Sequence, residues 1–181
     1  MTESPAPSLP PPPSPLEAVV AEVERHAAAA GWDRPPRLYA LVPTAELLAR
    51  EPALAAALGE EPEPGSLTPV EQDELPRHAT IEELLGGIAW PDDVLGTALV
   101  VERLVLPPEA EEGMPADEQE ALEWLAAHPQ RQEVRVAVGV LRGGERSCAL
   151  RMRSHDDDLA VLRGPDLLPG LADALAATLA D

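Results

Sequence analysis

Arginine side chains are concentrated in one segment of the chain, and they are the residues whose spacing could do chemistry. All 13 strongly basic residues are arginines, and five fall within residues 132–155: Arg135, Arg142, Arg146, Arg151 and Arg153. This segment has the alternating apolar pattern of a β-hairpin, in which successive side chains point to opposite faces. A candidate site for a small anion, such as a phosphate or carboxylate compound, therefore consists of Arg135, Arg151, Arg153 and His155.

The register of this hairpin decides which arginines lie together. The first strand places four valines on one face: Val134, Val136, Val138 and Val140. For the apolar residues of the second strand to share that face, we predict that Val140 pairs with Cys148 through a three-residue loop, Gly143-Gly144-Glu145, with a glycine bulge. The same register gives two further pairs, Val138 with Leu150 and Val136 with Met152.

This register also places Arg135 opposite Arg153, and like charges directly across two strands repel. Anionic groups must therefore compensate these arginines. The candidates are Glu102 on a neighbouring strand, the carboxylates of Asp156–Asp158, or a bound ligand. Because structural ion pairs are the common outcome for such clusters, we expect intramolecular carboxylates rather than a ligand.

The run His155-Asp156-Asp157-Asp158 places three carboxylates beside an imidazole, and such groups could bind Mg²⁺ or Ca²⁺ through oxygen atoms. Consecutive side chains do not converge on one ion without a dedicated loop, and the sequence has no glycine-punctuated ligand spacing. We therefore predict no metal site and no cofactor. Cys148 alternates with the apolar residues Leu150 and Met152, which predicts a buried and unreactive thiol.

The signatures of common enzymes are absent from the sequence. It contains no glycine-rich phosphate loop, nucleophile elbow, paired metal-binding histidines or Cys-x-x-Cys. We assign no catalytic residue, and we favour a protein that is not an enzyme without excluding one. Two functions remain. One is a non-catalytic binding or adaptor protein, whose partner is another protein or a second copy; the other is a small-anion-binding domain or enzyme built on the arginine face.

The formal charge of −20 limits the partners of the chain. Nucleic acids and anionic membranes attract basic surfaces, so neither is an expected partner. No apolar run approaches the roughly 20 residues of a membrane span, and the N-terminus lacks the basic and apolar regions of a signal peptide. The single cysteine, Cys148, cannot form an internal disulfide, which agrees with a cytoplasmic protein.

Several segments carry the signals of helix ends. Ser14-Pro15-Leu16-Glu17 is a capping box, and it predicts a helix that ends at Gly31. Further helices are predicted from Thr44, in two pieces that Pro52 separates and Gly59 ends, from Thr80 to about Ala89, from Asp117 until Pro129, and after a cap at Asp166. Residues 59–79 are rich in Glu, Pro and Gly, and we expect a loop there with one helical turn at Thr68–Glu71.

Strands are predicted at Arg37–Val42, at Thr97–Leu106 and in the two arms of the hairpin. The resulting order, α-β-α-α-β-α-β-β-α, predicts an α+β fold with a largely antiparallel sheet of about four strands and flanking helices. The length suits a single domain over residues 15–181. Residues 1–14 are rich in Pro, Ser and Ala, so we expect a disordered tail there.

Five short segments carry a resemblance to a known family: Gly31–Pro35, Ile88–Pro91, Val101–Pro107, Leu150–Asp158 and Gly164–Leu167. Together they resemble an uncharacterised family of small acidic cytoplasmic proteins from high-GC Gram-positive bacteria. The resemblance covers most of residues 15–181 and is most specific in the C-terminal third, while the proline tail lies outside it. It implies one intact domain in a cytoplasmic bacterial setting, and it assigns no activity and no residue role.

Overall fold

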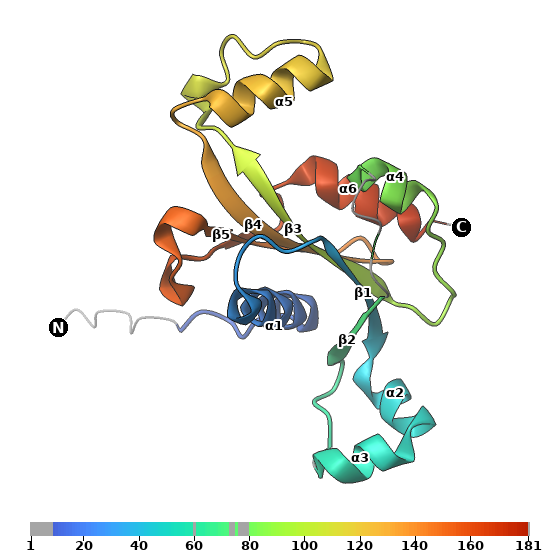
Figure 1. The fold of residues 1–181 in the computed structure, drawn as a ribbon. Helices are drawn as coiled ribbons and strands as arrows, with labels where there is room; N and C mark the ends of the chain where they lie inside the picture. The colour runs from blue at the N-terminus through green and yellow to red at the C-terminus, as the bar shows by residue number, and fades with distance from the viewer. Residues whose placement is uncertain (1–8, 60, 73–74, 76–79, 181) are drawn as a thin grey trace, which may run out of the picture.

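The computed structural model describes residues 9–59, 61–72, 75 and 80–180 (Figure 1). This part combines one antiparallel sheet with helices on both of its faces, which is an α+β arrangement. Most of the predicted tail, residues 1–8, lies outside the described residues, and residues 9–13 precede the first helix with exposed side chains. Within the described ranges, no helix is long and apolar enough to cross a membrane.

The described residues contain six α-helices: α1 (Pro15–Ala30), α2 (Thr44–Arg50), α3 (Pro52–Leu58), α4 (Ile81–Gly86), α5 (Glu118–Ala127) and α6 (Pro169–Thr178). The capping box of α1 forms as predicted: the Glu17 N–H donates to Ser14 Oγ at 3.2 Å, and the Ser14 N–H donates to Glu17 Oε2 at 3.0 Å. Such caps satisfy N–H groups that have no partner within the helix.

The sheet has six antiparallel strands in the order β2-β1-β3-β4-β5-β6 over the described residues. They are β1 (Arg37–Pro43), β2 (Leu67–Glu71), β3 (Gly96–Val105), β4 (Gln132–Leu141), β5 (Arg146–Met152) and β6 (Leu162–Gly164). The prediction of about four strands, and of the order α-β-α-α-β-α-β-β-α, is therefore wrong. The missed strands are the two edges of the sheet, β2 and β6.

Neither of the two missed strands shows a clear strand pattern in its sequence, and each has a physical reason for this. β2 lies where a helical turn was predicted, and it contains Pro69, which a strand tolerates at the edge of a sheet. β6 has only three residues, too few to show a period of two. The C-terminal helix was also placed too early, because its N-cap is Leu168 rather than Asp166.

Two apolar clusters lie on the two faces of the sheet. On one face, α1 packs through Leu16, Val19, Val20, Val23 and Ala27. On the other face, α4 and α6 cover the valines of β4. A side chain at Gly139 would bring its Cβ within 2.6 Å of Val20 Cγ2 and 3.0 Å of Leu16 Cδ1. The absence of a side chain there allows α1 to lie close to the middle of the sheet.

The hairpin β4–β5 keeps the predicted faces but not the predicted register. Val138 pairs with Cys148, rather than with Leu150, so the register is shifted by two residues. Arg135 consequently lies opposite Arg151, rather than opposite Arg153. The parity of the pairs is unchanged, and Cys148 is buried on the valine face as predicted.

The shift arises because Arg142 occupies the loop. The three-residue loop is Arg142-Gly143-Gly144, closed by the Leu141 N–H, which donates to Glu145 O at 2.9 Å; Gly144 has a positive φ of 97°. The guanidinium of Arg142 donates to four main-chain oxygens at 2.6 to 3.1 Å, those of Trp90, Pro91, Val94 and Leu179. These contacts join the turn to the end of α6 and to the segment before β3.

Candidate functional site

The centre of the predicted arginine face is a buried ion pair between α1 and β5. Arg151 Nε lies 2.5 Å from Glu24 Oε1, and Arg151 Nη2 lies 3.2 Å from Glu24 Oε2. The two side chains are 3% and 1% exposed. Charges removed from water to this degree are tolerated only when they are paired and hydrogen-bonded. These hydrogen bonds raise the pKa of Arg151 above its ordinary value.

The acidic run after β5 folds back onto the same arginine. Arg151 Nη1 lies 2.9 Å from Asp156 Oδ1, and Arg151 Nη2 lies 2.5 Å from Asp158 Oδ1. Asp157 turns away and accepts the Leu159 N–H at 2.8 Å. The three consecutive carboxylates therefore do not converge, and the described part of the chain has no group of three or more potential metal ligands.

Arg135 and Arg153 both contact Trp32, which lies between α1 and β1 in the sequence. The Arg135 guanidinium is 4.2 Å from the centroid of the indole ring, and that of Arg153 is 5.5 Å away. Trp32 Nε1 donates to Asp156 Oδ2 at 3.0 Å. This hydrogen bond is the largest effect lowering the pKa of Asp156, and Arg151 adds to it. Trp32 thus connects the arginines to the acidic run.

Carboxylates also compensate these two arginines. Arg135 Nη2 lies 3.6 Å from Glu102 Oε1 and donates to Gly31 O at 2.6 Å. Its Nη1 is buried without a hydrogen-bond partner among the described residues. Arg153 Nη1 lies 3.0 Å from Asp33 Oδ1 and 2.7 Å from Glu133 Oε2. The expected intramolecular partners, Glu102 and the acidic run, are therefore present.

His155 stands apart from this network. It lies in a 3₁₀ turn, is exposed, and has its Nδ1 3.0 Å from Ser154 Oγ. Of the four predicted ligand residues, the structure brings together Arg135, Arg151 and Arg153 around Trp32 and the carboxylates. These contacts favour a structural role for the three arginines over an open anion site.

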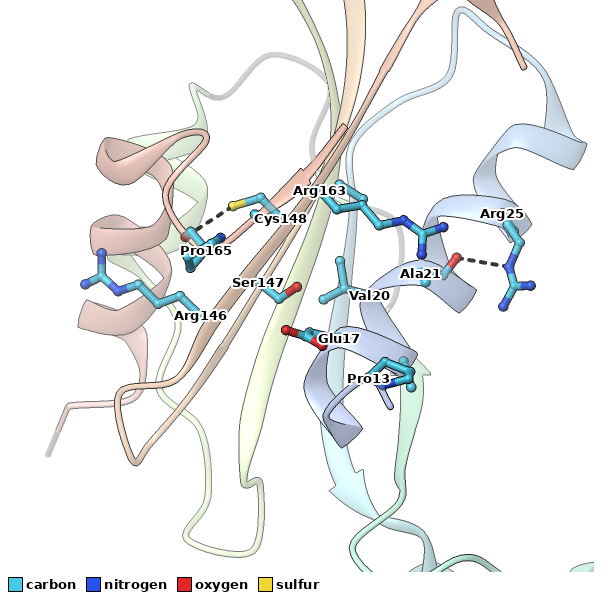
Figure 2. Close-up of a pocket in the computed structure, with 13 residues that line it drawn as sticks. Pro13, Glu17, Val20, Ala21, Arg25, Arg146, Ser147, Cys148, Arg163 and Pro165 are labelled. Atoms are coloured by element: carbon cyan, nitrogen blue, oxygen red, sulfur yellow. Dashed lines mark hydrogen bonds between the residues drawn. The ribbon is translucent and has the colours of Figure 1, made fainter. Parts of the chain in front are cut away.

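A second feature, a groove beside α1, was not predicted from the sequence. It lies between α1 and the strand pair β5–β6 and has a volume of about 420 Å³ (Figure 2). This volume falls within the range typical of ligand-binding clefts. Its apolar lining includes Val20, Ala21, Ala149 and Pro165. Figure 2 shows Arg163 extending from β6 toward Ala21 of α1, across the groove.

Three arginines line the groove in a chain whose formal charge is −20. Arg163 is exposed and forms no ion pair with a described residue. Arg25 donates from Nε to Ala21 O at 3.3 Å and likewise has no carboxylate partner in the described ranges. The side chain of Arg146 instead lies on the valine face of the sheet, where it pairs with Asp173 of α6 at 2.6 Å. Among the described residues that line the groove, the only carboxylate is that of Glu17, which is used in the cap of α1.

Ser147 adds a hydroxyl to the same groove. It pairs with Gly139 in the β4–β5 ladder, on the face that α1 covers, and Figure 2 shows its side chain pointing toward α1. Only 7% of the residue is exposed. Its hydroxyl makes no hydrogen bond with a described residue and is open to the groove, because the buried, unpartnered side-chain atoms of the described residues belong to Tyr39 and Arg135.

Together, these observations describe an α+β protein whose antiparallel sheet is covered by helices on both faces and which has a groove between α1 and β5–β6. A family described as PPA1309-like protein matches residues 16–180, and the chain belongs to that family. The match begins after the proline-rich tail and spans the region in which the sequence segments resembled a family. No curated protein and no solved structure matched the chain.

Proposed function

We propose that this protein is a non-catalytic binding or adaptor protein that holds an extended segment of a partner protein in the groove between α1 and β5–β6. The observation that carries the proposal is the groove itself. It combines about 420 Å³ of space, an apolar lining, and two arginines, Arg25 and Arg163, without a carboxylate partner among the described residues. Such a mixture of apolar walls and a few polar groups is typical of recognition sites.

The position of the groove at the edge of the sheet supports an extended ligand. β6 is a terminal strand of the sheet, and its outer side pairs with no described strand. Edge strands offer free N–H and C=O groups, and several protein families bind peptides by adding a strand at such an edge. A segment added along β6 would place alternate side chains over the groove, because side chains on a strand alternate between faces.

We also propose that the protein is cytoplasmic and that residues 15–181 form one domain. The charge of −20 supports a partner other than nucleic acid or an anionic membrane. The alternative function, small-anion binding at Arg135, Arg151, Arg153 and His155, requires a ligand to displace carboxylates from these arginines. The groove needs no such displacement.

Two tryptophan variants of α1 test the binding function. Ala18 is exposed and lines the groove, whereas Ala29 is exposed on the same helix and does not line it. Ala18→Trp should therefore fill the groove without disturbing the core, and Ala29→Trp is its matched control. A random peptide-display library is selected on each immobilised protein, with circular dichroism to verify folding.

We expect peptides that are enriched on the wild type and on Ala29→Trp, and not on Ala18→Trp. Equal enrichment on Ala18→Trp and the wild type would show that the groove is not the binding site. No enrichment on the wild type at all would contradict the binding function.

A further inference from the structure

We propose that the segment bound in this groove is acidic, with Asp or Glu at alternate positions. This inference rests on the binding function proposed above and adds the chemistry of the partner. It comes from the charges of the groove, from the unpartnered hydroxyl of Ser147, and from the position of Arg163 in the ladder.

Charge complementarity is the first argument. Arg25 and Arg163 line the groove without carboxylate partners among the described residues, although acidic side chains are abundant in the chain. Where arginines elsewhere are buried, as at Arg135 and Arg151, the fold supplies carboxylates. The guanidinium groups of the groove can donate to the carboxylates of a second molecule, in charge-assisted and bidentate hydrogen bonds.

The net charge of the protein does not prevent this recognition. Charges are screened over about 8 Å at physiological ionic strength. An acidic segment in the groove therefore interacts mainly with the charged side chains on the α1 side of the sheet that line it, which are those of Arg25, Arg163 and Glu17. The distant carboxylates reduce the rate of encounter more than the strength of the contact.

Ser147 supplies an independent sign that the groove receives a ligand. The residue is 7% exposed, its side chain points toward α1, and its hydroxyl is open to the groove without a partner in the described part of the chain. A hydroxyl at the base of a groove can donate to a carboxylate oxygen or accept from a ligand main-chain N–H.

The ladder position of Arg163 gives the spacing of the acidic residues. Arg163 pairs with Ala149, whose side chain packs on the α1 side of the sheet. A strand added outside β6 would place every second side chain on this same side, next to Arg163. Carboxylates at alternate positions would therefore all face the groove.

A pair of synthetic decapeptides tests this inference. In one, Glu alternates with Thr; in the other, Gln replaces every Glu, so that length and strand propensity are kept and the charge is removed. Both carry fluorescein, and binding to the full chain is followed by fluorescence anisotropy at near-physiological salt. The protein variants are Arg163→Glu and a matched control, Arg131→Glu, at an exposed arginine outside the groove that also has no ion pair with a described residue.

We expect the Glu peptide to bind the wild type at least about tenfold more tightly than the Gln peptide, the effect of one charge-assisted hydrogen bond. Arg163→Glu should abolish this preference and Arg131→Glu should keep it. Equal binding of the two peptides, lost in Ala18→Trp, would overturn the acidic preference while leaving the binding function intact.

Competition with inorganic phosphate distinguishes a groove that binds peptides from one that binds small anions. If phosphate at the same concentration as the unlabelled Glu peptide displaces the probe equally well, the groove binds small anions and the peptide proposal is wrong. If neither peptide binds the wild type, the acidic inference is also wrong, and the display selection decides the binding function separately.

Discussion

Glu24 of α1 and Arg151 of β5 form a two-point ion pair that is almost fully buried, with side-chain exposures of 1% and 3%. The pair joins the first helix to the fifth strand, across 127 positions of the sequence. Arg151 also binds the acidic run that follows its own strand. This pair therefore fixes the position of α1, which forms one wall of the groove.

Removing one partner of this pair should destabilise the protein strongly. Glu24→Gln leaves Arg151 buried with one carboxylate fewer, and breaking a buried pair costs about 3–5 kcal/mol. Glu22→Gln, at an exposed position of the same helix, should change the free energy of unfolding by less than about 0.5 kcal/mol. Urea unfolding measures both. A cost below about 1 kcal/mol for Glu24→Gln would mean that the pair does not hold α1 in place.

The stability should decrease in acid because several carboxylates are paired. A hydrogen bond from Trp32 contributes most to lowering the pKa of Asp156, and one from Arg153 contributes most to lowering that of Asp33. A carboxyl whose pKa is lower in the folded than in the unfolded protein stabilises the fold at every pH above its unfolded-state pKa. This stabilisation is lost as the pH falls through its folded-state pKa. The free energy of unfolding should therefore decrease below about pH 4.

Asp156→Asn should make this decrease smaller, and Asp92→Asn, at an exposed carboxylate without an ion pair in the described residues, should leave it unchanged. The measurement is urea unfolding from pH 7 to pH 2.5. Identical pH profiles of Asp156→Asn and the wild type would contradict the role of Asp156.

The Cys148 thiol should react slowly in the folded protein. It is buried on the valine face, its Sγ lies 3.7 Å from Pro165 O, and burial raises its pKa. The thiolate is the reactive form, so both effects reduce the rate. Ellman's reagent should modify it slowly in the native state and within seconds in denaturant. Immediate reaction in the native state would show that β5 is open.

An Arg153 variant distinguishes a structural role of the arginine face from a role as an anion-binding site. Its ion pairs with Asp33 and Glu133 are solvent-exposed, so Arg153→Gln should lower the free energy of unfolding by about 0–1 kcal/mol. Sulfate should change the melting temperature of the wild type and of this variant equally. A saturable rise in the wild type that disappears in Arg153→Gln would instead establish a ligand site on this face.

Periodicity and capping signals predicted the helices, the long strands and the faces of the hairpin. They failed where tertiary contacts decide the outcome. The hairpin register depends on the carbonyl oxygens that Arg142 reaches, and these come from segments distant in the sequence. The edge strands β2 and β6 were missed because one contains Pro69 and the other has only three residues.

The candidate site, too, was predicted only in part, because tertiary contacts decide the rest. The arginines and their partners Glu102, Asp156 and Asp158 could be identified from strand alternation and charge, whereas Asp33 and Glu133, the partners of Arg153, were not predicted. Glu24 carried a signal that was overlooked, since it follows Val20 by four positions on the apolar side of α1. The groove could not be predicted, because it depends on the distance between α1 and an edge strand that the sequence did not reveal.

Amide hydrogen exchange at β6 tests the central claim, that this edge and its groove bind an extended segment, most directly. The exchange of Leu162–Gly164 is measured by mass spectrometry in the full chain, with and without a peptide selected by display. We expect slower exchange in β6 and in the adjoining residues of α1, with no such slowing in Ala18→Trp. Protection confined to β2, or no change in β6 at saturating peptide, would contradict it.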